Sequence, residues 1–135
     1  PAAFAAAPFG YYQIGEETVL DTQTRLVWQR RVSGTRKWTD CLAYCENLDL
    51  AGKVDWRLPN AREYVTLVDY GGNPAIDQTA FNGEPFGSAG YWTSSVVQTF
   101  NRSIWFNATG GRNEDNNWSQ RYCRCVRGPD PVPAE

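Results

Sequence analysis

The sequence contains no histidine and no methionine. Histidine is the commonest general base and metal ligand near neutral pH, so the chain lacks the usual residue for proton transfer or metal binding. Because not even position 1 is methionine, we expect an excised piece of a longer precursor or a processed form. A signal peptide would not be visible in such a piece, so its absence carries no conclusion.

A strong charge of one sign and long apolar runs are also missing. Thirteen basic residues against fifteen acidic ones leave a net charge of −2. Nucleic-acid-binding modules carry a strong basic excess, so we expect no nucleic-acid partner. No apolar run approaches the roughly 20 residues of a membrane-spanning helix, so we expect no membrane insertion. An amphipathic anchor in residues 1–10 is a weaker alternative, because that stretch has no basic residue.

The sequence does contain enough apolar and aromatic residues for one globular domain. Its 135 residues suit a single domain, and the 41% apolar and 21% charged residues exclude disorder of the whole chain. Aromatic residues reach 14%, which favours a β-rich or loop-rich fold over a helical bundle.

Proline and glycine mark the ends of this domain. Residues 1–10 hold Pro1, Pro8 and Gly10 among alanines, and we interpret them as the end of a linker or stalk. Residues 129–135 are Pro-rich and extended, which is typical of a tail. The predicted domain therefore covers residues 11–128.

Local patterns within the domain predict its helices and strands. In chain order we expect strands at 11–14, 18–20 and 25–30, helices at 40–48 and from 60 to about 70, and strands at 91–97, 102–107 and 121–127. Thr39 is the expected N-cap of the first helix, and Asn60 and Glu63 form a capping box at the second. Gly71 and Gly72 are expected to end it. Two helices followed by several strands, joined by long loops, indicate an α+β fold.

The four cysteines stand in two pairs. Cys41 and Cys45 are four apart on a predicted helix and share a face, and Cys123 and Cys125 are two apart on a predicted strand and also share a face. Each pair spans about 6 Å, so two parallel disulfides can clamp the helix to the strand. A four-thiolate zinc site and a redox or copper role stay as alternatives, although zinc ligands usually come as C-x-x-C pairs. Two disulfides indicate an oxidising compartment: the periplasm, the cell surface or the medium.

Four strings in matching order carry a resemblance to a known family: 19–28 (VLDTQTRLVW), 55–63 (DWRLPNARE), 91–95 (YWTSS) and 124–128 (RCVRG). The chain resembles the Lcl C-terminal domain family of bacterial collagen-like adhesins over nearly the whole predicted domain. The resemblance implies a C-type-lectin-like fold with two helices, a small antiparallel sheet and long loops, related to that of formylglycine-generating enzymes. It also implies a secreted or surface-anchored domain that serves as an adhesive tip.

The resemblance has consequences for the cysteines and for the partners. It implies the disulfide Cys45–Cys125, with Cys41–Cys123 as an added pair. The adhesin that gives the family its name is similar to a trimer on a stalk and recognises sulfated polysaccharides. The resemblance therefore implies a homotrimer and a glycan or another cell-surface ligand.

Residues 110–121 (GGRNEDNNWSQR) form the segment that we expect to bind a ligand. It is polar, is expected to be flexible at its start, and holds side chains that match sugar hydroxyls and an aromatic ring that can stack on a sugar. The candidate binding residues are Arg112, Asn113, Glu114, Asp115, Asn116, Asn117 and Trp118. The alternative is a solvated hairpin loop with Trp118 tucked onto the core. No cofactor is expected, and calcium stays open as an alternative because Asn116-Asn117-Trp118 is similar to part of a lectin calcium site.

Other arginines have both a structural and a functional interpretation. The basic residues of the stretch 25–37, which has no acid, are Arg25, Arg30, Arg31, Arg36 and Lys37. Arg121, Arg124 and Arg127 are expected nearby through the disulfides. These residues either bind an anionic glycan or form a solvated face. Arg57 either contacts a ligand or satisfies buried carbonyls through its five donors, and we favour the second.

These patterns lead us to expect a non-enzymatic extracellular domain that binds glycans or other surface targets. The serines of 92–95 (WTSS) lack both a G-x-S-x-G motif and a histidine to activate them. A trimerising or protein-docking cap of a surface fibre is the second hypothesis. An enzyme of the formylglycine-generating type is the third, and it would need free thiols.

Overall fold

The computed structural model describes residues 3–8, 10–72, 75–81, 90–97, 102–107 and 110–132. Within these residues the chain forms two helices and ten strands. In chain order they are β1 (Ala3–Ala7), β2 (Gly10–Ile14), β3 (Thr18–Asp21), β4 (Val27–Gln29), β5 (Thr35–Arg36), α1 (Trp38–Glu46), α2 (Ala61–Val65), β6 (Gly90–Val96), β7 (Arg102–Asn107), β8 (Arg112–Asn116), β9 (Arg121–Tyr122) and β10 (Val126–Arg127). No helix in these described ranges is both long and apolar enough to cross a membrane.

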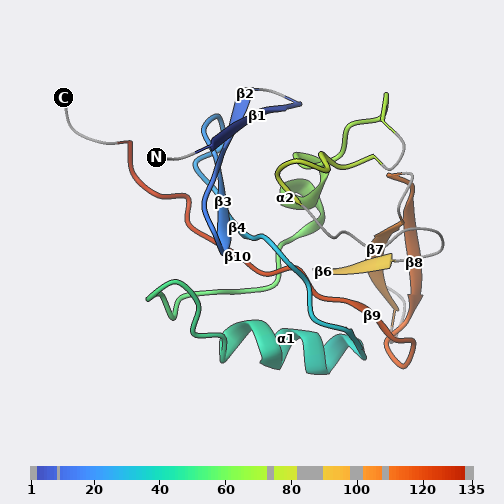
Figure 1. Cartoon of the computed structure of the whole chain (residues 1–135). Helices are drawn as coiled ribbons and strands as arrows, with labels where there is room; N and C mark the ends of the chain where they lie inside the picture. Colours follow the sequence, from blue (N-terminus) through green and yellow to red (C-terminus); the bar gives the residue numbers. More distant parts are fainter. Residues whose placement is uncertain are drawn as a thin grey trace.

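The strands form two five-stranded sheets. The first sheet has the order β1-β2-β3-β4-β10 and is antiparallel, and the second has the order β5-β9-β6-β7-β8 with one parallel pair, β6 and β9. Figure 1 shows the first sheet at the left, β7 and β8 at the right, α2 between them and α1 beneath. The fold is therefore α+β, as the sequence predicts, with two largely antiparallel sheets rather than one small one.

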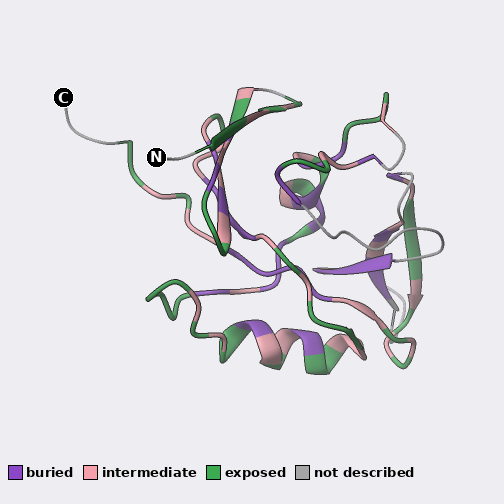
Figure 2. Cartoon of the chain, in the orientation of Figure 1, coloured by how far each residue is buried: buried purple, intermediate pink, exposed green. Residues whose placement is uncertain are grey.

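Aromatic side chains fill the space between the sheets. The Tyr64 ring of α2 stacks on Phe106 and Tyr91, with ring centroids 4.9 and 5.8 Å away, and meets Trp28 edge-on at 6.2 Å. All four side chains are buried, and Figure 2 shows β6, which carries Tyr91, largely in the colour of buried residues. Such aromatic pairs stabilise a core beyond the area that they bury.

The two disulfides centre a second apolar cluster. Cys41 of α1 is bonded to Cys123, and Cys45 of α1 to Cys125, with Cα atoms 5.6 and 5.5 Å apart. This is the pairing that the resemblance implies. The sulfurs are buried beside Trp92, whose indole N–H donates to a backbone carbonyl at 3.1 Å.

A fully buried arginine ties the C-terminal segment to β4. The Arg124 guanidinium donates to the carbonyl oxygens of Gln29 and Arg30 and lies over the Phe81 ring, 4.6 Å from its centroid. Burial lowers the pKa of Arg124 to about 10. The group therefore stays charged at neutral pH, and its role is structural rather than part of a basic surface.

Residues 1–10, which we expected to be a linker, contain a paired strand. β1 lies antiparallel to β2, with Phe4 opposite Gln13 and Ala6 opposite Tyr11. The alanines do not form a helix, as the prolines predict, and the pairing makes β1 the outermost strand of the first sheet. The position of the domain boundary stays a prediction.

Both helices differ in extent from the prediction. α1 begins at Trp38 with Lys37 at the N-cap position and no side-chain cap, so Thr39 as N-cap was wrong. The capping box of Asn60 and Glu63 is confirmed. α2 nevertheless ends at Val65 instead of near residue 70, because the following amides bond three residues back and tighten the chain into turns.

Two strand predictions were also wrong in detail, and another strand was not predicted. The strand expected at 25–30 is limited to Val27–Gln29, since Arg25 has a positive φ of 64° that a strand cannot contain. The strand expected at 121–127 is two strands, β9 and β10, in different sheets. The strand β8 lies in a part of residues 110–121 for which we predicted no strand.

Candidate functional site

The predicted ligand-binding segment forms the outermost strand of the second sheet and the turn that follows it. Arg112, Asn113, Glu114, Asp115 and Asn116 make up β8, and Asn117 and Trp118 lie in the turn. β8 has few residues of high strand propensity and forms because its backbone pairs with β7 over its full length. We call β8 and the turn 117–119 the β8 edge.

The register of β8 against β7 divides the candidate residues between two faces of the sheet. Asn113 lies opposite Trp105, whereas Arg112 lies opposite the buried Phe106. Directly opposite residues share a face and neighbours in a strand do not. The structure therefore does not bring all seven candidate residues together, although the segment is continuous in sequence.

Trp118 is the most exposed aromatic residue of the β8 edge, with 69% of its surface accessible. The turn that carries it is nevertheless held at several points. The Trp118 amide donates to Asn116 Oδ1 at 3.0 Å, the Trp38 amide of α1 donates to the Asn117 carbonyl at 3.3 Å, and Ser103 Oγ bonds Asn117 Oδ1 at 2.7 Å. The alternative that Trp118 is tucked onto the core is wrong, because the turn presents it to solvent.

A lysine lies beside this tryptophan. The Lys37 ammonium is 5.1 Å from the centroid of the Trp118 ring, within the range of a cation–π contact. The exposed ring and the ammonium therefore form one surface, which we call the Trp118 platform. The sequence alone contains both residues but gives no sign that α1 begins next to the turn.

Asp115 is used inside the protein. Arg121 and Ser119 donate to its Oδ2, and the Arg121 guanidinium stacks on Trp105 at 3.5 Å from the ring centroid. Partial desolvation raises the pKa of Asp115, but the hydrogen bonds from Arg121 and Ser119 outweigh it and hold the pKa below its usual value. Asp115 and Asn117 thus position the turn, and the Trp118 side chain faces solvent.

A second concave surface, which the sequence did not indicate, lies on the outer face of the first sheet. It encloses about 550 Å³. Its floor follows a row of cross-strand partners, Gln13, Leu20, Val27 and Arg127, from β2 to β10. The loop with Lys53 and the buried Trp56 forms one wall. We call this surface the Arg127 groove.

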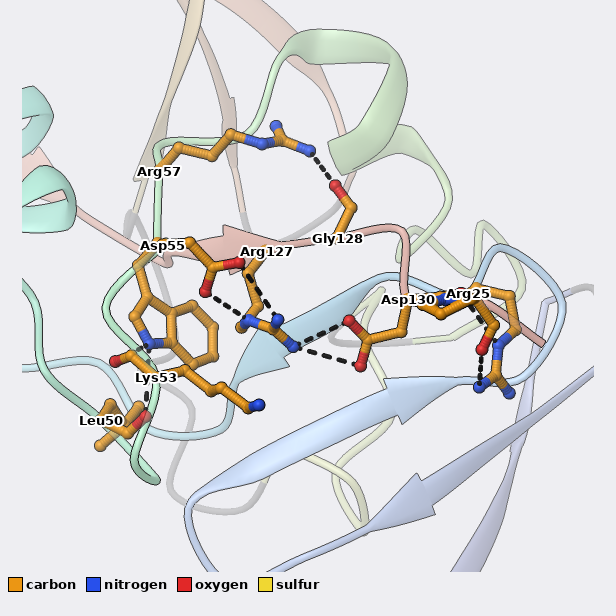
Figure 3. Close-up of polar contacts among 10 residues, drawn as sticks. Arg25, Leu50, Lys53, Asp55, Arg57, Arg127, Gly128 and Asp130 are labelled. Carbon is orange, nitrogen blue, oxygen red and sulfur yellow. Dashed lines mark hydrogen bonds and ion pairs between the residues drawn. The ribbon is translucent and has the colours of Figure 1, made fainter. Parts of the chain in front are cut away.

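Arg127 closes the groove by joining two segments to β10. Its guanidinium bonds Asp55 with Nε–Oδ1 at 2.7 Å and Asp130 with Nη1–Oδ1 at 2.9 Å (Figure 3). The hydrogen bond from Arg127 is the largest cause that holds the pKa of Asp55 below its ordinary value. Both carboxylates that Arg127 contacts come from other segments of the same chain, so Arg127 holds those segments against β10.

Arg57 has the same role next to this groove. Its guanidinium makes a two-pronged contact with Glu63, at 2.7 Å for each oxygen. It also donates to the Gly128 carbonyl at 3.0 Å (Figure 3). This arrangement agrees with the structural interpretation of Arg57.

The basic stretch 25–37 does not form an open cationic surface. Arg30 donates to the carbonyls of Ala80, Thr79 and Gly15, and Arg25 to those of Asp130 and Pro131. Arg36 donates to the Ser33 carbonyl and lies 4.0 Å from the Tyr44 ring centroid. Most of these guanidinium groups therefore satisfy carbonyls of the chain.

Calcium, the alternative to the expected absence of a cofactor, stays open without a defined site. Within the described ranges, no three side chains of histidine, cysteine, aspartate or glutamate gather as metal ligands would. Calcium sites use six to eight oxygens, which include backbone and amide oxygens as well.

The fold and its surfaces define a class of protein, a disulfide-bonded α+β domain with an exposed aromatic residue on a rigid sheet edge. The comparison with family models is specific: the model of the Lcl C-terminal domain matches residues 17–127, and the chain belongs to this family. No curated protein matches the chain. Membership suggests a domain associated with surface adhesins. The two disulfides are compatible with an extracellular location.

Proposed function

We propose that this chain is a non-enzymatic extracellular binding domain that recognises a glycan through the Trp118 platform. The observation that carries the proposal is an exposed indole that follows Asn117, a residue hydrogen-bonded to both α1 and β7. The exposed indole leaves apolar surface in contact with water instead of burying it in the protein. A turn that holds such a ring outward therefore supports a role in binding.

The chemistry of the platform suits a sugar. The apolar face of a pyranose stacks on an indole, and a positioned ammonium donates to hydroxyl, carboxylate or sulfate oxygens. Trp118 and Lys37 offer these two groups within 5.1 Å of one another. Because the turn is held before the ligand arrives, binding loses little conformational entropy.

Fold and assembly are part of the same proposal. The α+β arrangement and the family support a C-type-lectin-like fold, and the family supports a homotrimer at the tip of a stalk. Single sugar sites bind weakly, and several copies on one stalk raise the overall affinity through avidity. All four cysteines are in disulfides, so none offers the free thiol that formylglycine-generating chemistry needs.

A glycan array probed with the full chain tests the proposal, with and without calcium. The expected result is binding of at least one glycan that Trp118→Ala abolishes and Tyr70→Ala leaves unchanged. Tyr70 is a matched control because it is 70% exposed, against 69% for Trp118, and is not part of the β8 edge. No binding to any glycan, or equal losses in both variants, would overturn the proposal.

A protein-docking cap is a second candidate, and the outer face of the first sheet favours it. Phe4 and Tyr11 are 61% and 64% exposed and lie on that face, since they share it with their partners Gln13 and Ala6. A cap predicts self-association through this face. Sedimentation of the full chain checks it, and a strict monomer at high concentration would exclude it.

A further inference from the structure

A surface depression of about 580 Å³ lies between α2 and the β8 edge. Its lining residues are Asn60, Ala61, Arg62, Val65, Ser95 and Arg112. Arg62 comes from the first turn of α2 and Arg112 from the start of β8, and both are exposed. The fold thus brings two arginines that are 50 positions apart in sequence to one hollow.

The polar groups that line this depression are donors with no acid among them. Asn60 Oδ1 already accepts from the Glu63 amide at 2.8 Å, and Ser95 Oγ already accepts from the Ala61 amide at 2.9 Å. The side-chain NH2 group of Asn60 and the hydroxyl proton of Ser95 are left to donate, together with two guanidinium groups. A ligand group that fits such a set accepts hydrogen bonds and carries negative charge.

The two arginines have no acid of their own in the part of the chain that the structure describes. Glu63, which follows Arg62, is held by Arg57 at 2.7 Å. Arg112 also lines a neighbouring depression of about 410 Å³ together with Glu114, which has an interaction of its own, and no ion pair joins the two. By contrast, Arg57, Arg121 and Arg127 are all in ion pairs.

We propose that this depression is an oxyanion-binding site, which takes the carboxylate or sulfate group of a ligand. Arg62 and Arg112 supply paired guanidinium donors, and Asn60 and Ser95 add neutral ones. Val65, which is 37% exposed, offers an apolar contact to the carbon skeleton that carries the anion. The inference does not depend on Trp118, which lies at the other end of the β8 edge.

NMR titration of the isotope-labelled full chain tests the site. The probes are sodium acetate and sodium sulfate, with sodium chloride at matched ionic strength as the control. Saturable shifts of the Arg62 and Arg112 Nε–H signals are expected with acetate, sulfate or both, and none with chloride. Glucuronate and glucose 6-sulfate then show whether the site prefers a carboxylate or a sulfate on a sugar.

Variants assign the binding to these residues. Arg62→Gln and Arg112→Gln are each expected to weaken oxyanion binding roughly tenfold, since each removes one charged pair of donors. Arg31→Gln, at an exposed arginine outside the depression, is the matched control and is expected to change nothing. Glu114→Gln is expected to strengthen binding, because it removes a like charge beside the ligand.

The proposal is overturned if the shifts do not saturate, if chloride produces them equally, or if Arg31→Gln weakens binding as much as Arg62→Gln. Trp118→Ala is expected to leave the oxyanion affinity unchanged. Glycan binding that fails while oxyanion binding persists would therefore count against the Trp118 platform alone, and the reverse result against this site alone.

Discussion

The Arg127 groove and the β8 edge both carry arginines, but those arginines have different partners. At the groove, Arg57 and Arg127 bond carboxylates of the chain itself. Next to the β8 edge, Arg62 and Arg112 face a depression that contains no acid. Paired guanidinium groups hold segments together, whereas unpaired ones are available to a ligand. The comparison is the basis on which we propose that the pairing of charges, rather than their number, distinguishes a binding surface.

The largest effect on stability is expected from removing a disulfide. This change tests how far the region held by paired groups depends on covalent links. Cys45→Ala with Cys125→Ala opens a link between residues 80 apart. On the chain-entropy account the loss is about 3–5 kcal/mol of unfolding free energy, measured by urea denaturation. The pair Cys41→Ala with Cys123→Ala, with a separation of 82, is the matched comparison and is expected to lose a similar amount. Unchanged stability in both would contradict this account.

The next effect concerns the support of the β8 edge. A Cβ atom on Gly90 of β6 would lie 2.5 Å from Trp105 Cε3 and 3.1 Å from Arg121 Nη1. Gly90→Ala is therefore expected to push Trp105 and Arg121 from their stacked positions and to cost about 1–3 kcal/mol, measured by thermal unfolding.

Gly71→Ala is the control for this change, because its nearest contact would be an Asp69 carboxylate oxygen at an ordinary 3.5 Å. A loss at Gly71 equal to that at Gly90 would show that glycine flexibility, not the approach of Trp105, sets the cost.

How much could be predicted from sequence depends on whether the signal was local. The capping box of Asn60 and Glu63 lies within four residues and was correct. The family strings and the spacing of the cysteines also identified the disulfide-linked α+β domain. β8 was missed because its residues have low strand propensity and pair only through tertiary contacts with β7.

The candidate site shows the same limit. The sequence led us to predict that Trp118 binds a ligand, which stays a prediction, and the exposure of its side chain depends on the contact between its turn and Trp38. The depression between Arg62 and Arg112 depends on α2 and β8 lying together, which neither segment indicates alone. The Arg127 groove depends on the register between neighbouring strands. A single sequence does not indicate which residues of two strands lie opposite one another.

The contribution of the Arg57–Glu63 ion pair to stability is also expected to depend on pH. Burial raises the pKa of Glu63, but hydrogen bonds from Arg57 and the Asn60 amide outweigh it and lower the pKa below 4.5. A lowered pKa means that the ion pair stabilises the fold above pH 4.5 and loses this contribution as the pH falls through the folded pKa. Glu63→Gln is therefore expected to lower the Tm at pH 7 and to match the parent near pH 2. A constant difference across this range would show that the charge is not responsible.

The smallest effect on stability is expected at Arg62, and it tests the comparison directly. Arg57→Gln breaks a half-exposed ion pair and is expected to cost about 1 kcal/mol after allowance for solvent screening. Arg62 is exposed and makes no ion pair with another described residue, so Arg62→Gln is expected to change the free energy of unfolding by less than about 0.5 kcal/mol in the same urea experiment. Equal losses would mean that Arg62 also supports the fold, and the distinction between paired and available arginines would then fail at α2.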